Sequence, residues 1–446
     1  MKKLIFLFII CLIAHAALAQ QQEFSLQEAI DYALQNNRTA KNASRDVDAA
    51  VKQKWETIAT GLPQLKASLG YNNFIKQPVS LIPAEFFGGN PGEFAEIAFG
   101  TEQSMNALAV LNQKIFDGSY LVGLQSAKVF LEISQNAKEK TDLEVRKAVI
   151  DAYGNVLLAE ENVNILKRNK SILEKNLEET TKIYENGLAE EEDVEQLKIT
   201  LAGVESNLNN TERLKELAYQ MFNMTLGIDI DTQLRLTDFL SGLADQNTVL
   251  SLLDAEENVE QTVDYKIAVN DKRSKELLLK LEKSKALPKI DAFINGGYDG
   301  YSDQFNFTSS NQRWFGSSLL GVSMDIPIFS SLGRTAATQR AKINLEKSTD
   351  DLIETEERIK LEIAAAKSNY RFAIEDYQIK QDNLNLAERI ESKNQIKFFE
   401  GIASSFELRQ AQTQLYAAQQ ELLKAMFDVI SKKGELETVL NEIPKN

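Results

Sequence analysis

The chain has only one cysteine, Cys11, and only one histidine, His15. Both lie in the opening stretch MKKLIFLFIICLIAHAALA, where two lysines precede a short apolar run and an Ala-x-Ala site ends at Ala19. These features predict a secretory signal peptide over residues 1–19. Without it, the mature chain would have no disulfide, thiolate nucleophile, imidazole base or typical zinc or copper site. We therefore expect no enzyme, no cofactor and no metal.

Basic residues and apolar helical segments are also scarce. The chain has 50 Lys and Arg residues against 65 Asp and Glu residues, a formal net charge of −15. Such a surface repels nucleic acid, so no nucleic-acid partner is expected. After the predicted signal peptide, no window is apolar enough for a transmembrane helix. If the chain enters a membrane, it must do so in another way.

Glycine and proline are rare, with 21 and 7 residues in the chain. One glycine lies in YENGLAEEEDVEQL, Tyr184–Leu197, where a turn interrupts a long stretch without proline. This sequence returns 214 residues later as FFEGIASSFELRQA, Phe398–Ala411. The matched pairs are Tyr184 and Phe398, Gly187 and Gly401, and Asp193 and Glu407.

The similarity extends well beyond the two turns. Apolar residues recur at spacings of three and four in the same phase, which indicates an internal duplication. The 3.5-residue period predicts long helices that pack as coiled coils, with Gly187 and Gly401 at tight reversals between antiparallel helices. The first stripe includes Val149, Val156, Val163, Leu166, Leu173 and Leu177, and the equivalent positions are Ile363, Tyr370, Tyr377, Lys380, Ala387 and Glu391, of which Lys380 and Glu391 interrupt the pattern.

These patterns divide the chain into two structural repeats, in which the long helices start near Gly118 and Gly333 and each measure roughly 100 Å. Shorter helices at about 27–60 and 262–286 precede the predicted strands. An irregular equatorial connector is expected at 227–260. The first repeat, 20–230, contains a β-hairpin at 62–116, a long helix to 186, a turn and a helix at 190–226. The second repeat, 261–446, contains a β-hairpin at 287–329, a long helix to 399, a turn and a helix at 404–440.

Each repeat contains a segment that cannot be helical. GLPQLKASLGYNNF begins at Gly61 and ALPKIDAFINGGY begins at Ala286, and the proline in each ends the preceding helix. Apolar and polar residues then alternate with a period of two, and returning strands are expected at Ala107–Phe116 and Trp314–Ile328. Aromatic residues near the far end suit an interfacial girdle. These are Tyr298, Tyr301, Trp314 and Phe315.

The length of these predicted strands suits a tilted crossing of a bilayer. The same alternation also describes an ordinary half-buried sheet. In lipid, however, four strands with open edges would leave amides unpaired, so copies of the chain would have to contribute strands jointly. The loop Gln77–Gly100 would project at the cell surface, where it would pack over a barrel mouth or contact a partner.

With its signal peptide, duplicated plan, Leu-Pro before each first strand and Tyr/Phe-x-x-Gly at each turn, the chain resembles the TolC-like outer-membrane efflux proteins. The resemblance implies a mainly α fold with a small β part, in which long coiled-coil helices form an α-barrel. Four strands per chain would close a transmembrane β-barrel in a homotrimer embedded in outer-membrane lipid. The family's members are passive exit ducts of tripartite efflux or type I secretion systems. A periplasmic membrane-fusion adaptor and an inner-membrane pump engage the tip.

The resemblance also suggests residues for the periplasmic aperture. Asp193 aligns with an acid that helps to hold the tip shut in the best-known member. Phe398 aligns with its tyrosine partner but lacks the hydroxyl, and Ala403 aligns with its arginine partner. Glu407 and Gln410 align with two aspartates that ring the constriction. The tip of this chain must therefore close by other contacts, and the helix-turn tips themselves would be formed by Tyr184, Gly187 and Gly401.

Two interpretations of the acids Glu190–Asp193 remain open. They can cap the free amides of a first helical turn, or they can face the lumen or the adaptor as a cation-selective ring. The principal alternative for the whole chain is a periplasmic coiled-coil scaffold or adaptor that never enters the membrane. The cargo stays open among drugs, metals, lipids and proteins.

Overall fold

The computed structural model describes residues 22–248, 250–254 and 258–441, so the predicted signal peptide lies outside the described residues. The chain forms two compact units, and each unit contains segments of both predicted repeats. The unit boundaries fall inside continuous helices, so the units cut across the division by repeats. The helical unit comprises Met1–Asp48, Ile133–Asn270 and Asp350–Asn446, and the strand unit comprises Ala49–Glu132 and Asp271–Thr349.

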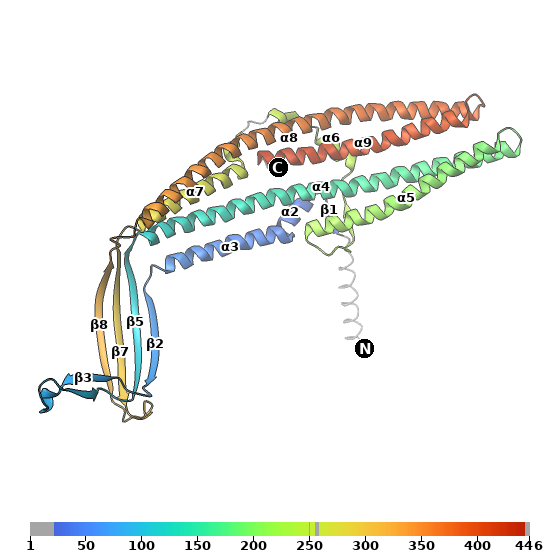
Figure 1. The fold of residues 1–446 in the computed structure, drawn as a ribbon. Coiled ribbons are helices and arrows are strands. Elements are labelled where there is room, and N and C mark those ends of the chain that lie inside the picture. The colour runs from blue at the N-terminus through green and yellow to red at the C-terminus, as the bar shows by residue number, and fades with distance from the viewer. Residues whose placement is uncertain (1–21, 249, 255–257, 442–446) are drawn as a thin grey trace, which may run out of the picture. The chain divides into compact units, whose positions relative to one another are not determined.

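Two antiparallel helix pairs dominate the helical unit, and their turns lie at the same end (Figure 1). The first tip hairpin consists of α4 (Gly118–Glu185) and α5 (Glu191–Leu226). The second consists of α8 (Gly333–Phe399) and α9 (Ser405–Leu440). Helices α4 and α8 have 68 and 67 residues, or roughly 100 Å each at 1.5 Å per residue. The prediction of very long helices is confirmed.

Aromatic side chains fill the core of the helical unit. Tyr153 and Phe222 are fully buried and meet edge to face, with ring centroids 5.7 Å apart. The Tyr153 hydroxyl lies 2.7 Å from Asp238 Oδ2 and 3.0 Å from the carbonyl oxygen of Phe24. Because a buried hydroxyl needs partners, these contacts fix the connector and the N-terminal segment against α4. Among the described residues, no helix combines the length and the apolarity needed to cross a membrane.

The connector that was expected to be irregular contains regular elements. Strand β6 (Leu234–Leu236) pairs in parallel with β1 (Gln22–Phe24). It is followed by α6 (Leu240–Gln246) and by two 3-10 turns, η2 (Leu250–Asp254) and η3 (Val259–Gln261). This part of the prediction was wrong because β6 is stabilised by a strand more than 200 residues away, which no local pattern reveals.

The helix expected at 27–60 is divided into α2 (Leu26–Asn36) and α3 (Arg38–Ala59). Asn37 has non-helical backbone angles, and its side-chain oxygen accepts two N–H groups from the first turn of α3 at 2.8 and 3.2 Å. Its amide nitrogen donates to the carbonyl oxygen of Thr225 at 2.7 Å. Asn37 thus caps α3 and ties the break to the end of α5.

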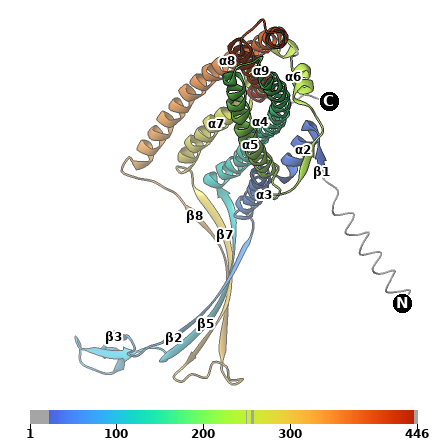
Figure 2. The same cartoon turned by 90° about the vertical axis from the view of Figure 1, so that its right-hand side faces the viewer.

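The strand unit contains one four-stranded antiparallel sheet in the order β2-β5-β7-β8, and Figures 1 and 2 show its twist. Strands β2 and β8 are its edges, and each has one neighbour within the chain. The sheet therefore leaves a row of backbone amides unpaired on both sides. The strands are β2 (Gln64–Asn73), β5 (Gln103–Asp117), β7 (Lys289–Ser302) and β8 (Trp314–Asp325).

One face of this sheet is apolar across all four strands. Residues directly opposite one another share a face, and the register gives the row Leu65, Leu111, Ile294 and Leu320. Leu65 and Leu320 are each 72% exposed. We call this side of the sheet the apolar face. The other side is mixed: it carries the polar residues Lys66, Asn106, Asn112, Asp291, Asn295 and Ser317 and the apolar residues Leu108, Val110, Phe293 and Leu319.

The predicted aromatic girdle is divided between the two faces. Tyr298 and Trp314 lie on the apolar face, where the same register also places Tyr71. Tyr301 and Phe315 lie on the opposite face, with ring centroids 6.1 Å apart. The four residues therefore cannot all belong to one girdle, because successive side chains of a strand point to opposite sides.

The segment expected as a surface loop at 77–100 contains a small hairpin of its own. Strands β3 (Val79–Pro83) and β4 (Phe94–Ala98) pair antiparallel, with the 3-10 turn η1 (Ala84–Phe87) between them. Phe86 is 78% exposed and Phe94 is 63% exposed. The strands belong to a separate two-stranded sheet, so they do not extend the four-stranded one.

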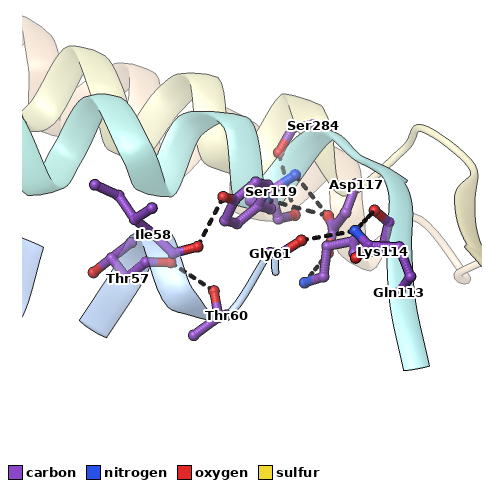
Figure 3. A network of polar contacts seen from close by, with 10 residues as sticks. Thr57, Ile58, Thr60, Gly61, Gln113, Lys114, Asp117, Ser119 and Ser284 are labelled. Atoms are coloured by element: carbon purple, nitrogen blue, oxygen red, sulfur yellow. Dashed lines mark hydrogen bonds and ion pairs between the residues drawn. The ribbon is translucent and has the colours of Figure 1, made fainter. Parts of the chain in front are cut away.

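Polar contacts fix the strands to the helix ends within the strand unit (Figure 3). Gln113 Nε2 donates to the carbonyl oxygen of Gly61 at 2.9 Å, which joins β5 to the chain after α3. The Asp117 carboxylate accepts the N–H of Ser119 at 2.8 Å at the start of α4. The Ser119 hydroxyl lies 3.3 Å from that of Ser284, the last residue of α7 (Val263–Ser284).

Candidate functional site at the two helical turns

The turns between the paired helices have the same backbone geometry. Gly187 and Gly401 both have φ of +73°, a conformation that a side chain disfavours. The N–H of Gly187 donates to the Tyr184 carbonyl oxygen at 2.8 Å, and the N–H of Gly401 donates to the Phe398 carbonyl oxygen at 3.0 Å. The spacing of Tyr or Phe three residues before Gly is therefore the spacing of one hydrogen-bonded turn.

Asp193 and Glu407 occupy equivalent positions in the first turns of α5 and α9. Asp193 Oδ2 accepts the N–H of Glu190 at 3.3 Å, and Glu407 Oε2 accepts the N–H of Ser404 at 2.9 Å. The Ser404 hydroxyl in turn accepts the N–H of Glu407 at 3.3 Å, which completes a capping box. Capping alone thus accounts for an acid at the same site in both repeats.

The structure brings together only some of the predicted aperture residues. Asp193 and Phe398 line one small cavity between the tip hairpins, together with Arg409. Glu407 and Gln410 are exposed and do not line this cavity. Tyr184 is also exposed, at 39%.

Arg409 joins the two turns and was not among the predicted site residues. Its guanidinium Nη1 donates to Gln196 Oε1 at 2.6 Å, which links α9 to α5. Ala403, the residue that aligns with the arginine of the best-known family member, lies six residues before it and is half-buried. Arg409 could not be selected from its own sequence position, because its partner Gln196 is 213 residues away.

Three asparagines of α4 also bond across to the second tip hairpin. They lie at seven-residue spacing, so they share a stripe of the helix. Asn169 and Asn176 are buried, at 4% and 1% exposure. We call these three bonds the amide ladder. They run from Gln420 Nε2 to Asn162 Oδ1 (2.7 Å), from Asn169 Nδ2 to Gln419 Oε1 (2.9 Å) and from Gln395 Nε2 to Asn176 Oδ1 (3.0 Å).

Glu391 is one of the two residues that interrupt the apolar stripe of the second repeat. It is partly buried within the tip, and this burial raises the pKa of its carboxyl above the ordinary value. The other interruption, Lys380, forms an ion pair with Glu421 of α9 at 3.0 Å. Within the described residues, no group of three or more His, Cys, Asp or Glu side chains could hold a metal ion.

The arrangement of long paired helices, an apolar-faced sheet and matched turns agrees with a known family. Residues 29–221 and 273–442 match the family of outer membrane efflux proteins. The chain belongs to this family. The resemblance inferred from the sequence is confirmed, and the family is one of transport proteins in the outer membrane.

Individual relatives match along nearly the whole chain. The outer membrane protein TolC of Vibrio cholerae is 24% identical over 434 residues, which cover 96% of this chain and 93% of the relative. The structure of CusC matches with a TM-score of 0.74 at 16% identity, covering 93% of this chain and 91% of CusC. The CmeC outer membrane channel of Campylobacter jejuni matches with a TM-score of 0.72 at 17% identity, covering 94% and 85%.

Proposed function

We propose that this chain is the passive exit duct of a tripartite efflux or type I secretion system. The observation that carries the proposal is the apolar face, which runs unbroken from Leu65 to Leu320 across a sheet with two open edges. An apolar face, backed by a face that is richer in polar side chains although it also carries Leu108, Val110 and Leu319, suits a wall between lipid and an aqueous lumen. A duct of this kind needs no catalytic group, no cofactor and no nucleic acid.

The open edges support assembly with further copies of the chain. Unpaired strand amides are not tolerated in hydrocarbon, so β2 of one copy must pair with β8 of the next. Such a contact joins two different surfaces and closes only as a ring. Three copies would give twelve strands, and a homotrimer in outer-membrane lipid is the assembly that the family membership favours.

The helical unit offers two further surfaces for the same ring. An apolar groove of α4 and α5 is lined by Ala148, Ala152 and Ala159 on α4 and by Leu217 and Met221 on α5. On α8, Leu361, Phe372 and Ile379 are between 56% and 70% exposed. By the 214-residue offset, these three positions correspond to 147, 158 and 165, the level of the groove on α4. We expect the α8 stripe of one copy to pack into the groove of the next.

The turns would form the periplasmic end, where an adaptor and an inner-membrane pump engage the duct. Tyr184, Gly187 and Gly401 would form the tips of the hairpins. Asp193, Phe398, Glu407 and Gln410 would line or adjoin the aperture. The acids would then have a second role besides capping, because carboxylates repeated around a ring favour cations.

Replacing Asp193 and Glu407 with Asn and Gln tests this second role. These variants remove the charge and keep an acceptor for the capped N–H, so the helix starts should persist. We expect weaker block by divalent cations and an altered single-channel conductance in planar bilayers. Glu195→Gln, on the exposed side of α5, is the matched control. Unchanged conductance and unchanged block would contradict a role of the acids in the aperture.

Fractionation of the full chain tests the proposed duct itself. Heat-modifiable oligomers in the outer membrane and discrete conductance after reconstitution are the expected results. Removal of the predicted signal peptide, residues 1–19, should keep the chain in the cytoplasm. Well-folded soluble monomers in the periplasm would instead favour the coiled-coil scaffold.

A further inference from the structure

One level of the sheet carries apolar side chains on the side opposite the apolar face, which we call the inner face. The register places Val110 of β5, Asn295 of β7 and Leu319 of β8 side by side in one row. On the same face, Leu108 lies in the next row toward the far end of the strands, and Phe293 lies in the next row toward the helices. We call the four apolar side chains, Leu108, Val110, Phe293 and Leu319, the inner apolar patch.

Two side chains of the patch lie against glycines of a neighbouring strand. A Cβ atom at Gly321 of β8 would be 2.5 Å from the ring of Phe293, and a Cβ atom at Gly297 of β7 would be 3.1 Å from the Leu108 side chain. Glycine inside a strand permits this close approach. The side chains thus lie low across the strands and form a shared surface over β5, β7 and β8.

Charged side chains bound the patch along the strands. The next row of the inner face toward the helices places Lys114 directly opposite Asp291. The next row toward the far end contains Asp299. The patch is therefore an apolar level between two levels that carry charge.

Within the level of the patch, one edge carries a positive charge. Lys66 of β2 is exposed and lies directly opposite Val110. It is the only charged side chain in the three described rows that hold the patch. Asp291 and Asp299 are each two strands and two rows from Lys66, or roughly 16 Å from strand geometry, and salt water screens charges over such a distance. The charge that a molecule on the patch meets is therefore positive.

Packing within the sheet does not account for the patch. Leu319 is 57% exposed, although a lumen-facing position of a strand is ordinarily polar. Asn295 Oδ1, in the middle of the patch, is buried and has no hydrogen-bond partner among the described residues, which a self-sufficient core would avoid. An exposed apolar surface with a polar rim is typical of a binding site.

We propose that the inner apolar patch and Lys66 form a transit site for amphipathic anions inside the duct. The apolar body of such a molecule covers Leu319, Val110 and Phe293, and its anionic group lies at Lys66. Burial of apolar surface holds the molecule on the wall, and the lysine selects the sign of its charge. The inference rests on the proposed function, since the inner face lines a lumen only if the sheet is part of a duct.

The arrangement suits passage rather than retention. The patch covers a bound molecule from one side only, and Lys66 is exposed, so the other side of the molecule stays in water. Conduction requires binding that is favourable enough for entry and weak enough for release. A flat surface with a single charge meets both requirements, whereas an enclosed pocket would retain its ligand.

Current block in planar bilayers that contain the reconstituted full chain tests the site. Octanesulfonate has an alkyl chain and a negative charge. Ethanesulfonate keeps the charge with a shorter chain, and octyltrimethylammonium keeps the chain with a positive charge. We expect octanesulfonate to reduce the single-channel current at concentrations where the other two have little effect. Equal block by octanesulfonate and octyltrimethylammonium would overturn the assignment to anions, and no block by octanesulfonate would overturn the site.

Variants of the patch locate the block. Val110→Asn with Leu319→Asn removes apolar surface and Lys66→Gln removes the charge, and each should raise the concentration for half-block at least several-fold. Leu319→Met keeps an apolar side chain and should leave the block unchanged. Lys289→Gln is the matched control for the charge, because Lys289 is exposed on the inner face near the helices. Half-block at the same concentration in every variant would contradict a site at the patch, as would equal shifts in Lys66→Gln and Lys289→Gln.

A fluorescent label provides a measurement that does not depend on conductance. Ser317→Cys places a thiol on the exposed inner face of β8 beside the patch, and the only natural cysteine, Cys11, lies in the predicted signal peptide. In proteoliposomes, octanesulfonate should shift the emission of a polarity-sensitive dye on this thiol, and addition of Lys66→Gln should weaken the shift. Emission that ignores octanesulfonate, or an equal shift without the lysine, would contradict the site.

Failure of this inference can be distinguished from failure of the proposed function. If the unmodified chain forms no channel and no oligomer in the outer membrane, the proposed duct is wrong. If it conducts, and octanesulfonate neither blocks the current nor shifts the emission of the label, the duct stands and the patch is not a site. Heat-modifiable oligomers of each variant show whether it has folded and assembled.

Discussion

The helical unit buries a core of large apolar side chains, whereas the sheet of the strand unit leaves its apolar face exposed. In the helical unit, Tyr153 and Phe222 are fully buried within the chain. In the strand unit, Leu65 and Leu320 are 72% exposed although they belong to a regular sheet. The helical unit thus buries a core of its own, although Leu361, Phe372 and Ile379 on α8 stay exposed. The strand unit requires a covering that the single chain does not provide, and lipid with neighbouring copies is the covering we propose.

The difference follows from the geometry of the two kinds of element. A helix satisfies its own backbone and can bury one stripe against another helix of the same chain. A sheet satisfies its backbone only through neighbours, and four strands leave two edges open. The buried core therefore lies mainly in the helical unit, and substitutions in the two units should have different consequences.

Truncation of a buried aromatic residue should have the largest effect. Phe222→Ala removes a fully buried ring that contacts Tyr153 and should lower the free energy of unfolding by about 3–5 kcal/mol. Leu320→Ala on the exposed sheet face should change it little in detergent. Thermal unfolding followed by circular dichroism compares the two variants. Equal losses would show that the sheet has a packed interior of its own, contrary to the comparison.

A charge on the apolar face should have the next largest effect. Leu320→Arg should cost about 2–4 kcal/mol if this position lies near the middle of the bilayer. Ser317→Arg on the opposite face of the same strand is the control and should be tolerated in a water-filled lumen. The yield of heat-modifiable oligomers in the outer membrane is the measurement. If the two variants assemble equally well, the apolar face does not contact lipid.

Loss of a helix cap should have a smaller and local effect. Ser404→Ala removes the hydroxyl that accepts the N–H of Glu407 and should cost about 1 kcal/mol. Hydrogen exchange should become faster in the first turn of α9, whereas exchange in the sheet stays the same. Ser392→Ala at an exposed position inside α8 is the control. Faster exchange across the whole chain would show that the turn is coupled to the sheet.

The pH dependence contributed by Glu391 should be the smallest effect. Burial raises the pKa of this carboxyl in the folded chain, so the folded state binds the proton more tightly than the unfolded state. Stability should therefore rise as the pH falls through the raised pKa toward the ordinary value. Glu391→Gln should remove that rise and stabilise the chain at neutral pH. Glu388→Gln, one turn earlier and exposed, should behave like the natural chain in melts at several pH values.

Much of the architecture could be predicted from the sequence because it depends on local periodicity. The alternation by three and four gave the long helices, and the alternation by two gave the strands beginning after Pro63 and Pro288. Tyr184-x-x-Gly187 and its repeat predicted the turns, since both the glycine φ and the hydrogen bond that closes the turn are local. Family resemblance then pointed to the correct class of protein.

The prediction was weaker wherever a contact joins distant residues. The break at Asn37 depends on a carbonyl of α5, and β6 depends on the N-terminal strand. Tyr301 and Phe315 were placed with the girdle because proximity along the strand was considered without the face. The seven-residue spacing of Asn162, Asn169 and Asn176 was present in the sequence, but the glutamines to which these asparagines bond lie on α8 and α9.

The sequence by itself determined which segments are helix, strand and turn, because backbone preferences and apolar periods act over a few residues. It also determined that the chain contains an internal duplication. Only the tertiary structure decided that Arg409 contacts Gln196, that Asn37 bonds to Thr225, and that the apolar face of the sheet is exposed. Those features arise when residues about 200 positions apart are brought together, and a side chain acquires its role only from the groups that surround it in space.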